Sequence, residues 1–115
     1  MNTNEWLVAT RKVAQLPSGY QFVHVRPRAI CGDGFSVSIQ ASRLTYCAPR
    51  NDLGPYCKVE LGYPSVSDDL IQEYAESPER PIGTVYGQVP VEIVDALLEK
   101  HGGIANAGLL NRMDN

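Results

Sequence analysis

Two segments with alternating apolar and polar residues dominate the middle of the chain. Residues 35–42 (FSVSIQAS) place an apolar residue at every odd position, and residues 56–62 (YCKVELG) repeat the pattern. A period of two is typical of a strand with one buried face and one polar face. The two segments therefore predict an antiparallel pair joined by a long loop. The predicted core face of this pair consists of Phe35, Val37, Ile39, Cys57, Val59 and Leu61.

The residues before this pair predict another strand and one ambiguous element. Residues 5–16 carry apolar side chains at spacings that fit either a strand or a short helix. Residues 20–27 alternate and end at Pro27, which cannot donate a ladder hydrogen bond, so the strand ends there or lies at an edge. Residues 32–34 (Gly-Asp-Gly) then predict a tight turn into the strand at 35–42.

Two helices are expected in the second half of the chain. Ser67 is suited to an N-cap, and Asp68 and Asp69 would follow in the first turn of a helix over about 68–76. After a short strand at 84–89, Pro90 is suited to the start of a helix over 91–101. The whole pattern predicts an α+β fold, an antiparallel sheet of about four or five strands covered by two helices.

The length of 115 residues predicts a single domain over residues 1–115. No apolar run approaches the ~18 residues of a membrane-spanning helix, so no membrane association is expected. The first residues contain an acid and no apolar core, unlike a signal peptide. We therefore expect a cytoplasmic protein with reduced cysteines.

The net charge of −3 conceals an asymmetry between the two halves of the chain. Residues 1–50 hold six basic and two acidic side chains, whereas residues 51–115 hold four basic and eleven acidic ones. This layout fits two faces for two partners, or an anionic ligand on the first half. Alternatively, the halves intermix in space and their charges cancel.

No catalytic residue, metal or cofactor is predicted. The chain has three cysteines, Cys31, Cys47 and Cys57, without a close pair, and packing is their expected role. A zinc site with His24 and a nucleophilic Cys47 remain as alternatives. The glycines form neither a dinucleotide-binding nor a P-loop pattern.

The runs SVSIQASRLTYCAPRN, KVELGYPS and TVYGQVPVEIVDALLEKHGGI resemble a group of uncharacterised small accessory proteins of bacteriophages and prophages. The likeness covers residues 32–104 and carries no catalytic signature and no functional residues. It implies a phage accessory protein that acts in the cytoplasm of the host cell. Such proteins often counter host defence, including CRISPR–Cas complexes and nucleotide second messengers.

Two functions are therefore expected as alternatives. The first is a non-enzymatic interaction protein that inhibits a host defence complex, in the manner of an anti-CRISPR protein. The second is a binding module that sequesters a small anionic ligand such as a nucleotide second messenger. An exposed edge strand ending at Pro27 would also allow pairing with a second copy of the chain.

Two sets of residues are candidates for binding. Arginine binds phosphate bidentately and tyrosine stacks on bases, which favours a site on the first half of the chain. A row of acids on the predicted helix over 68–76 would instead imitate phosphates toward a basic channel. Solvated surface charge is the alternative for both sets. The first set is Arg26, Arg28, Arg43, Tyr46, Arg50 and Tyr56, and the second is Asp68, Asp69, Glu73 and Glu76.

Overall fold

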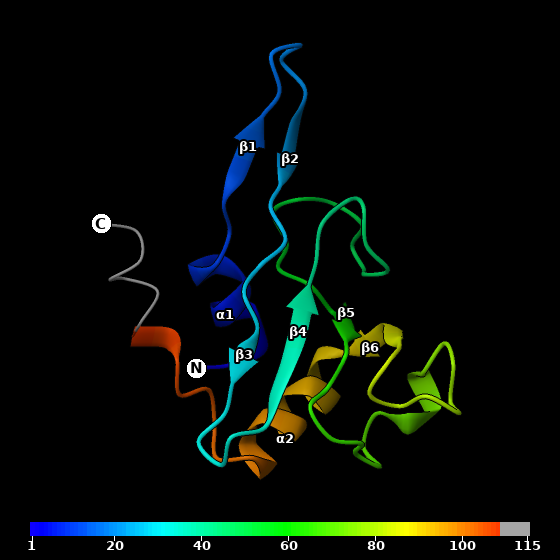
Figure 1. Ribbon diagram of the computed structural model, residues 1–115. Helices are drawn as coiled ribbons and strands as arrows, with labels where there is room; N and C mark the ends of the chain where they lie inside the picture. The colour runs from blue at the N-terminus through cyan, green and yellow to red at the C-terminus, as the bar shows by residue number, and fades with distance from the viewer. Residues whose placement is uncertain (109–115) are drawn as a thin grey trace.

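A computed structural model describes residues 1–108 of the chain (Figure 1). Two α-helices, six strands and one 3-10 turn make up its regular structure. Within residues 1–108, no helix has the length and apolar character needed to cross a membrane. In chain order the elements are α1 (Thr3–Ala9), β1 (Val13–Gln15), β2 (Gln21–Val23), β3 (Ala29–Ile30), β4 (Ser36–Gln40), β5 (Lys58–Gly62), η1 (Gln72–Tyr74), β6 (Val85–Pro90) and α2 (Val91–Lys100).

Four of the strands form the main sheet, in the order β3-β4-β5-β6, and every neighbouring pair is antiparallel. Ile39 of β4 lies opposite Leu61 of β5, and Val59 of β5 lies opposite Val89 of β6. All four of these side chains are fully buried. The α+β prediction, with an antiparallel sheet covered by two helices, is confirmed.

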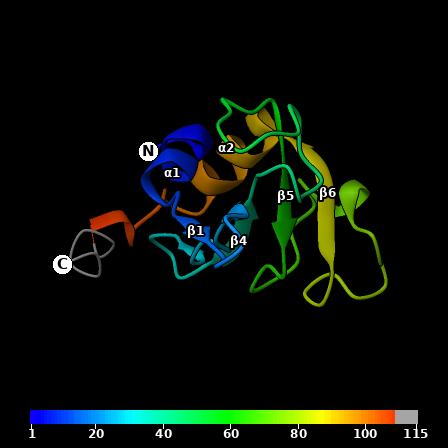
Figure 2. The ribbon, with the colours of Figure 1, turned by 90° about the horizontal axis from the view of Figure 1, so that it is seen from above.

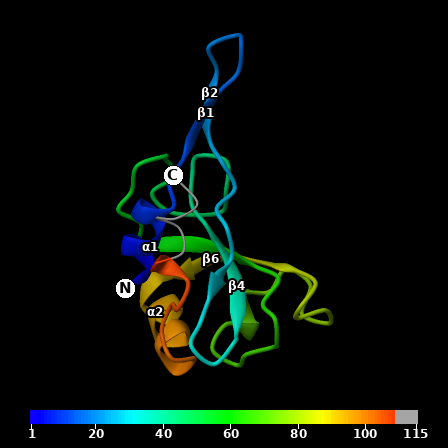
Figure 3. The same ribbon diagram turned by 60° about the vertical axis from the view of Figure 1, so that its left-hand side comes forward.

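Both helices lie on the same face of the main sheet (Figures 2 and 3). Trp6 and Leu7 of α1 and Leu97 of α2 are buried in the core that this face shares with the sheet. The backbone N–H and the hydroxyl of Thr3 donate to Oδ1 of Asp95, at 2.8 and 2.5 Å, which joins the start of α1 to the middle of α2. The opposite face of the sheet carries the polar residues of the alternating strands.

Several local predictions are confirmed. The turn at 32–34 connects β3 to β4, with Gly34 at φ +94° and its N–H donating to Cys31 O at 2.9 Å. Burial alternates along β4 as its sequence predicts. α2 starts directly after Pro90. Gly102 follows the C-terminal end of the helix at φ +93°, a backbone conformation that favours glycine.

The helix predicted over 68–76 is wrong, because this segment contains only the short turn η1. The carboxylate of Asp68 accepts the N–H of Leu70 at 3.0 Å and is also bound by Lys100, so it does not cap a helix. The N–H of Glu76 then donates to Val85 O at 2.9 Å. Tertiary contacts to α2 and β6 therefore override the local helix signal.

The two elements before the main sheet differ from their predictions in length. Residues 5–16, for which strand and helix were both open, divide into α1 and β1. The strand predicted over 20–27 is limited to β2, because the Arg26 N–H donates to Gln40 Oε1 at 2.9 Å and its side chain turns inward. Cys57 was predicted in the core face but is exposed and lies just before β5.

Strands β1 and β2 form a separate ribbon that projects from the body of the molecule (Figures 1 and 3). By contrast, both edges of the main sheet are partly covered. At β3, the Ala105 N–H donates to Ile30 O at 2.7 Å, and Glu76 covers part of β6. The predicted pairing of two copies would use the strand that ends at Pro27, and the part of it that forms, β2, lies in this ribbon and not in the main sheet.

Candidate functional site

A groove runs between the ribbon and the polar face of the main sheet, and we call it the outer groove. It has a volume of about 570 Å³. Its rim carries three strongly exposed apolar side chains, Val25 (84% exposed), Leu44 (61%) and Tyr63 (51%). Polar side chains from β4 and β5 form its floor, since these are the outward positions of the alternating strands. The main floor residues are Ser38, Gln40 and Glu60.

Internal hydrogen bonds hold the floor of the outer groove. The side-chain amide of Gln40 donates to Arg26 O and to Ser38 Oγ, both at 3.0 Å. Glu60 Oε1 accepts the N–H of Tyr46 at 3.3 Å. The floor is thus preformed, and its polar groups have fixed positions.

The structure distributes the predicted arginines among different places. Arg28 is held by Ser36 and by Tyr63 O, the latter at 2.6 Å from its Nη2. Arg43 is paired with Asp52, and its guanidinium lies 5.1 Å from the ring centroid of Tyr20 at the end of the ribbon. Both therefore position loops and the ribbon.

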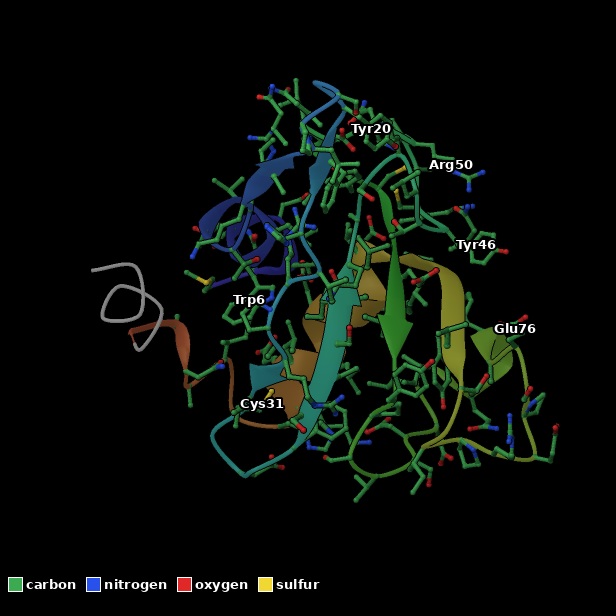
Figure 4. All side chains as sticks on the ribbon, turned by 45° about the horizontal axis from the view of Figure 1, so that its top comes forward. Trp6, Tyr20, Cys31, Tyr46, Arg50 and Glu76 are labelled. Atoms are coloured by element: carbon green, nitrogen blue, oxygen red, sulfur yellow. The ribbon has the colours of Figure 1, made fainter. Side chains whose placement is uncertain are left out.

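Tyr46 and Arg50 are the two predicted residues that lie together on the surface. The Arg50 guanidinium is 5.8 Å from the Tyr46 ring centroid, and both side chains point outward (Figure 4). Arg26 and Tyr56 are instead buried, at 4% and 5% exposure. The predicted set therefore divides into a surface pair, two positioning arginines and two buried residues.

The predicted acidic face is not an exposed helix stripe. Asp68 is only 5% exposed, and its Oδ2 lies 2.9 Å from Lys100 Nζ. Asp69, Glu73 and Glu76 are exposed, and Glu76 projects outward near β6 (Figure 4). Asp68 cannot belong to an acidic surface, because its carboxylate is already used inside the molecule.

His101 connects Asp68 to a second carboxylate, that of Asp33. Its Nδ1 lies 2.7 Å from Asp33 Oδ2 and its Nε2 lies 3.0 Å from Asp68 Oδ2. The imidazole also stacks on Phe35, with ring centroids 4.0 Å apart. We call Asp33, Asp68, Lys100 and His101 the His101 cluster.

The His101 cluster shifts three pKa values. Burial lowers the pKa of His101, but its hydrogen bonds to Asp33 and Asp68 outweigh burial and raise the pKa above the ordinary 6.5. The N–H of Phe35 and then His101 lower the pKa of Asp33. Burial opposes ionisation of Asp68, yet the Leu70 N–H, Lys100 and His101 lower its pKa overall. The shifts favour the protonated form of His101 and the ionised forms of both aspartates, so the groups of the cluster stabilise one another.

Three side chains with potential catalytic chemistry, His101, Cys31 and Cys47, are held by internal contacts or buried. A general base needs a free ring nitrogen, but carboxylates occupy both nitrogens of His101. Burial raises the pKa of the Cys31 thiol, which keeps it protonated. Cys47 is also buried, and its Sγ donates to Ser42 O at 3.1 Å. Among residues 1–108, no group of histidines, cysteines and acids has an arrangement suited to a metal ion.

The rim of the outer groove was not predicted from the sequence. Val25 and Leu44 are isolated apolar residues in irregular segments, and Tyr63 follows β5 with φ +51°. Val25 belongs to the alternating run over 20–27, whose two faces both carry apolar residues, and Leu44 lies in a segment with no periodicity. Neither signal shows whether the residue is buried or exposed. Comparisons with family profiles, with curated proteins and with solved structures find no match for this chain.

Proposed function

We propose that this chain is a non-enzymatic interaction protein that binds a protein complex through the outer groove. The observation that carries the proposal is the rim of Val25, Leu44 and Tyr63, each more than half exposed around one concave surface. The resemblance to phage accessory proteins supports a more specific role, the inhibition of a host defence complex. In that role the protein would act by occupying a surface of the complex.

The composition of the outer groove fits a protein partner. Interfaces place apolar and aromatic side chains where water is excluded, and hydrogen-bonding groups beside them. Val25 and Leu44 supply exposed apolar area, Tyr63 supplies an aromatic ring, and the fixed floor supplies polar atoms. An exposed group of large apolar side chains around a concavity is typical of a binding surface.

The His101 cluster supports the non-enzymatic part of the proposal. His101 makes two hydrogen bonds to carboxylates and stacks on Phe35, contacts that explain its presence without catalysis. The charged groups of the His101 cluster thus stabilise the fold. Binding, rather than chemistry, is the activity that we propose for the surface.

The test uses two groove variants and one matched control. Val25→Asp and Leu44→Asp each place a charge on the rim, whereas Val66→Asp places the same charge at a residue that is 53% exposed outside the groove. We would express each protein in bacteria whose CRISPR–Cas system targets an infecting phage. We expect the wild type and Val66→Asp to restore phage plating and to co-purify with the effector complex.

Loss of both effects in Val25→Asp and Leu44→Asp, with unchanged thermal unfolding, would support docking through the outer groove. If both groove variants restore phage plating and co-purify with the effector complex as the wild type does, docking through the outer groove is wrong. If the wild type neither restores plating nor co-purifies with the effector complex, the proposed role against CRISPR–Cas is wrong.

A further inference from the structure

A second cavity lies between α1 and residues 53–56, and we call it the α1 pocket. Its volume is about 350 Å³. Apolar walls come from Leu7 and Val8 of α1 and from Leu53 and Pro55 of the facing loop. Two guanidinium-bearing residues, Arg11 and Arg26, also line it. The α1 pocket thus combines apolar walls with two cations.

Arg26 is the buried cation of this pocket. Its Nε and Nη2 donate to Leu7 O at 3.2 and 3.1 Å, and its Nη1 donates to Ala41 O at 2.8 Å. A guanidinium has five N–H groups, so two have no hydrogen-bond partner within residues 1–108. No carboxylate of that part of the chain lies within 4.0 Å of it. A charged group that is 4% exposed and retains unpaired donors is suited to an anion.

Arg11 is the exposed cation of the α1 pocket. Its Nε donates to Asp52 O at 2.9 Å, which leaves its terminal nitrogens without a partner in the described part of the chain. The side chain of Asp52 itself binds Arg43. Burial lowers the pKa of Arg26, Tyr56 and more weakly Asp52 oppose this, and the neighbouring charge of Arg11 adds to the lowering. The pocket therefore has more positive than negative charge.

The walls of the pocket are fixed in the absence of a ligand. The side chain of Asn4 donates to Tyr56 O and accepts from Tyr56 N, both at 2.9 Å. The Tyr56 hydroxyl donates to Asn51 O at 2.7 Å. These bonds hold the loop against α1. A ligand would therefore enter a preformed site, and little conformational entropy would be lost on binding.

We infer that the α1 pocket binds a small organic phosphate, with the phosphate between Arg11 and Arg26 and an aromatic or aliphatic body against Leu53 and Pro55. Arginine is suited to phosphate because its planar donors match two oxygens at once. The volume lies in the range of about 300–1,000 Å³ that is usual for small-molecule sites. The expected small anionic ligand is thereby assigned to Arg11 and Arg26, and not to Arg28, Arg43 or Arg50.

This inference is independent of the proposed docking function. The outer groove and the α1 pocket share Arg26 as a lining residue but no other side chain. Substitutions at Val8 and Arg11 leave the rim of the outer groove intact. Each proposal can therefore fail without the other.

The test is a titration of the folded protein with AMP and with inorganic phosphate, followed by calorimetry and by amide chemical shifts. Arg11→Gln removes the exposed cation, and Val8→Asp, at a residue that is 73% exposed, adds a negative charge at the wall. Arg80→Gln is the matched control, because it removes an exposed cation far from the pocket in sequence and outside its lining.

We expect saturable AMP binding with shifts at Asn4 and Leu53, and weaker binding of phosphate, which lacks the body. Arg11→Gln should weaken AMP binding about tenfold and Val8→Asp more, whereas Arg80→Gln should bind like the wild type. The inference is overturned if neither probe binds saturably. It is also overturned if both pocket variants bind AMP as the wild type does, or if the shifts lie elsewhere.

Discussion

His101 Nε2 lies 3.0 Å from Asp68 Oδ2, and this contact joins the end of α2 to the loop before η1. The same ring binds Asp33 through Nδ1 at 2.7 Å and stacks on Phe35. One side chain thereby connects three segments that are distant in sequence. Since the Asp68 side chain is 2% exposed, the fold depends on the positive groups that neutralise it.

Replacing His101 by Gln is expected to destabilise the protein by about 1–3 kcal/mol, the usual cost of leaving a buried polar partner incompletely satisfied. Asp68 would retain Lys100, so the loss should stay below that of a fully unpaired buried charge. Urea denaturation gives the difference in free energy of unfolding. Lys100→Gln is the comparison: its side chain is 51% exposed, so we expect a smaller loss. Equal stability of His101→Gln and wild type would contradict this role.

The stability of the protein should depend on pH through the same cluster. The pKa of His101 is raised above 6.5 in the folded state, so its contribution is complete below pH 6.5 and is lost as the pH rises through the folded value. The pKa values of Asp33 and Asp68 are lowered below 3.8, so their contribution is present above pH 3.8 and is lost as the pH falls through the folded values. We expect maximal stability between these limits.

Thermal unfolding across this pH range would test the expectation, with His101→Gln as the control. The variant should lose the decline on the alkaline side of pH 6.5, because the titrating group is gone. It should retain part of the acid decline, because Asp33 and Asp68 still accept backbone N–H groups. An alkaline decline of the same size in the variant would assign it to another group.

Asp95→Ala is expected to loosen α1. Oδ1 of Asp95 accepts both the N–H and the hydroxyl of Thr3, a fully buried residue at the first turn of α1. Loss of this acceptor should cost about 1–2 kcal/mol, as for other helix-end hydrogen bonds. Amide hydrogen exchange should accelerate along α1. Glu92→Ala, at an exposed position of α2, should change neither quantity.

The elements that follow from local sequence were predictable. The alternation in β4, the turn at 32–34 and the capped helix α2 each depend on neighbouring residues, and each is present. The helix predicted over 68–76 is absent, because Asp68 is bound by Lys100 and His101, which lie about thirty residues later in the chain. Such a long-range ion pair leaves no periodic signal that a sequence pattern could show.

The candidate sites were less predictable than the fold. Arg26 was expected on a surface, but a carbonyl at the end of α1 and another after β4 hold its guanidinium inside. Arginine is rarely buried, so sequence reasoning favours exposure. Arg11 went unnoticed because its importance arises only from its position beside Arg26 in the α1 pocket. A sequence shows which residues carry a charge. It does not show which of them are buried, and the burial of Arg26 is what gives this residue its role.

The buried indole of Trp6 yields the last prediction. Trp6 is fully buried, and its Nε1–H has no hydrogen-bond partner within the described residues. Trp6→Ala should cost about 3–5 kcal/mol because it removes a large core side chain. Trp6→Phe should cost within about 1 kcal/mol, since losing an unsatisfied buried donor, worth about 1–3 kcal/mol, offsets the lost ring volume. Circular dichroism should follow the urea denaturation, because Trp6 is the only tryptophan. A loss in Trp6→Phe as large as in Trp6→Ala would mean that the indole N–H is satisfied in solution, for example by a buried water.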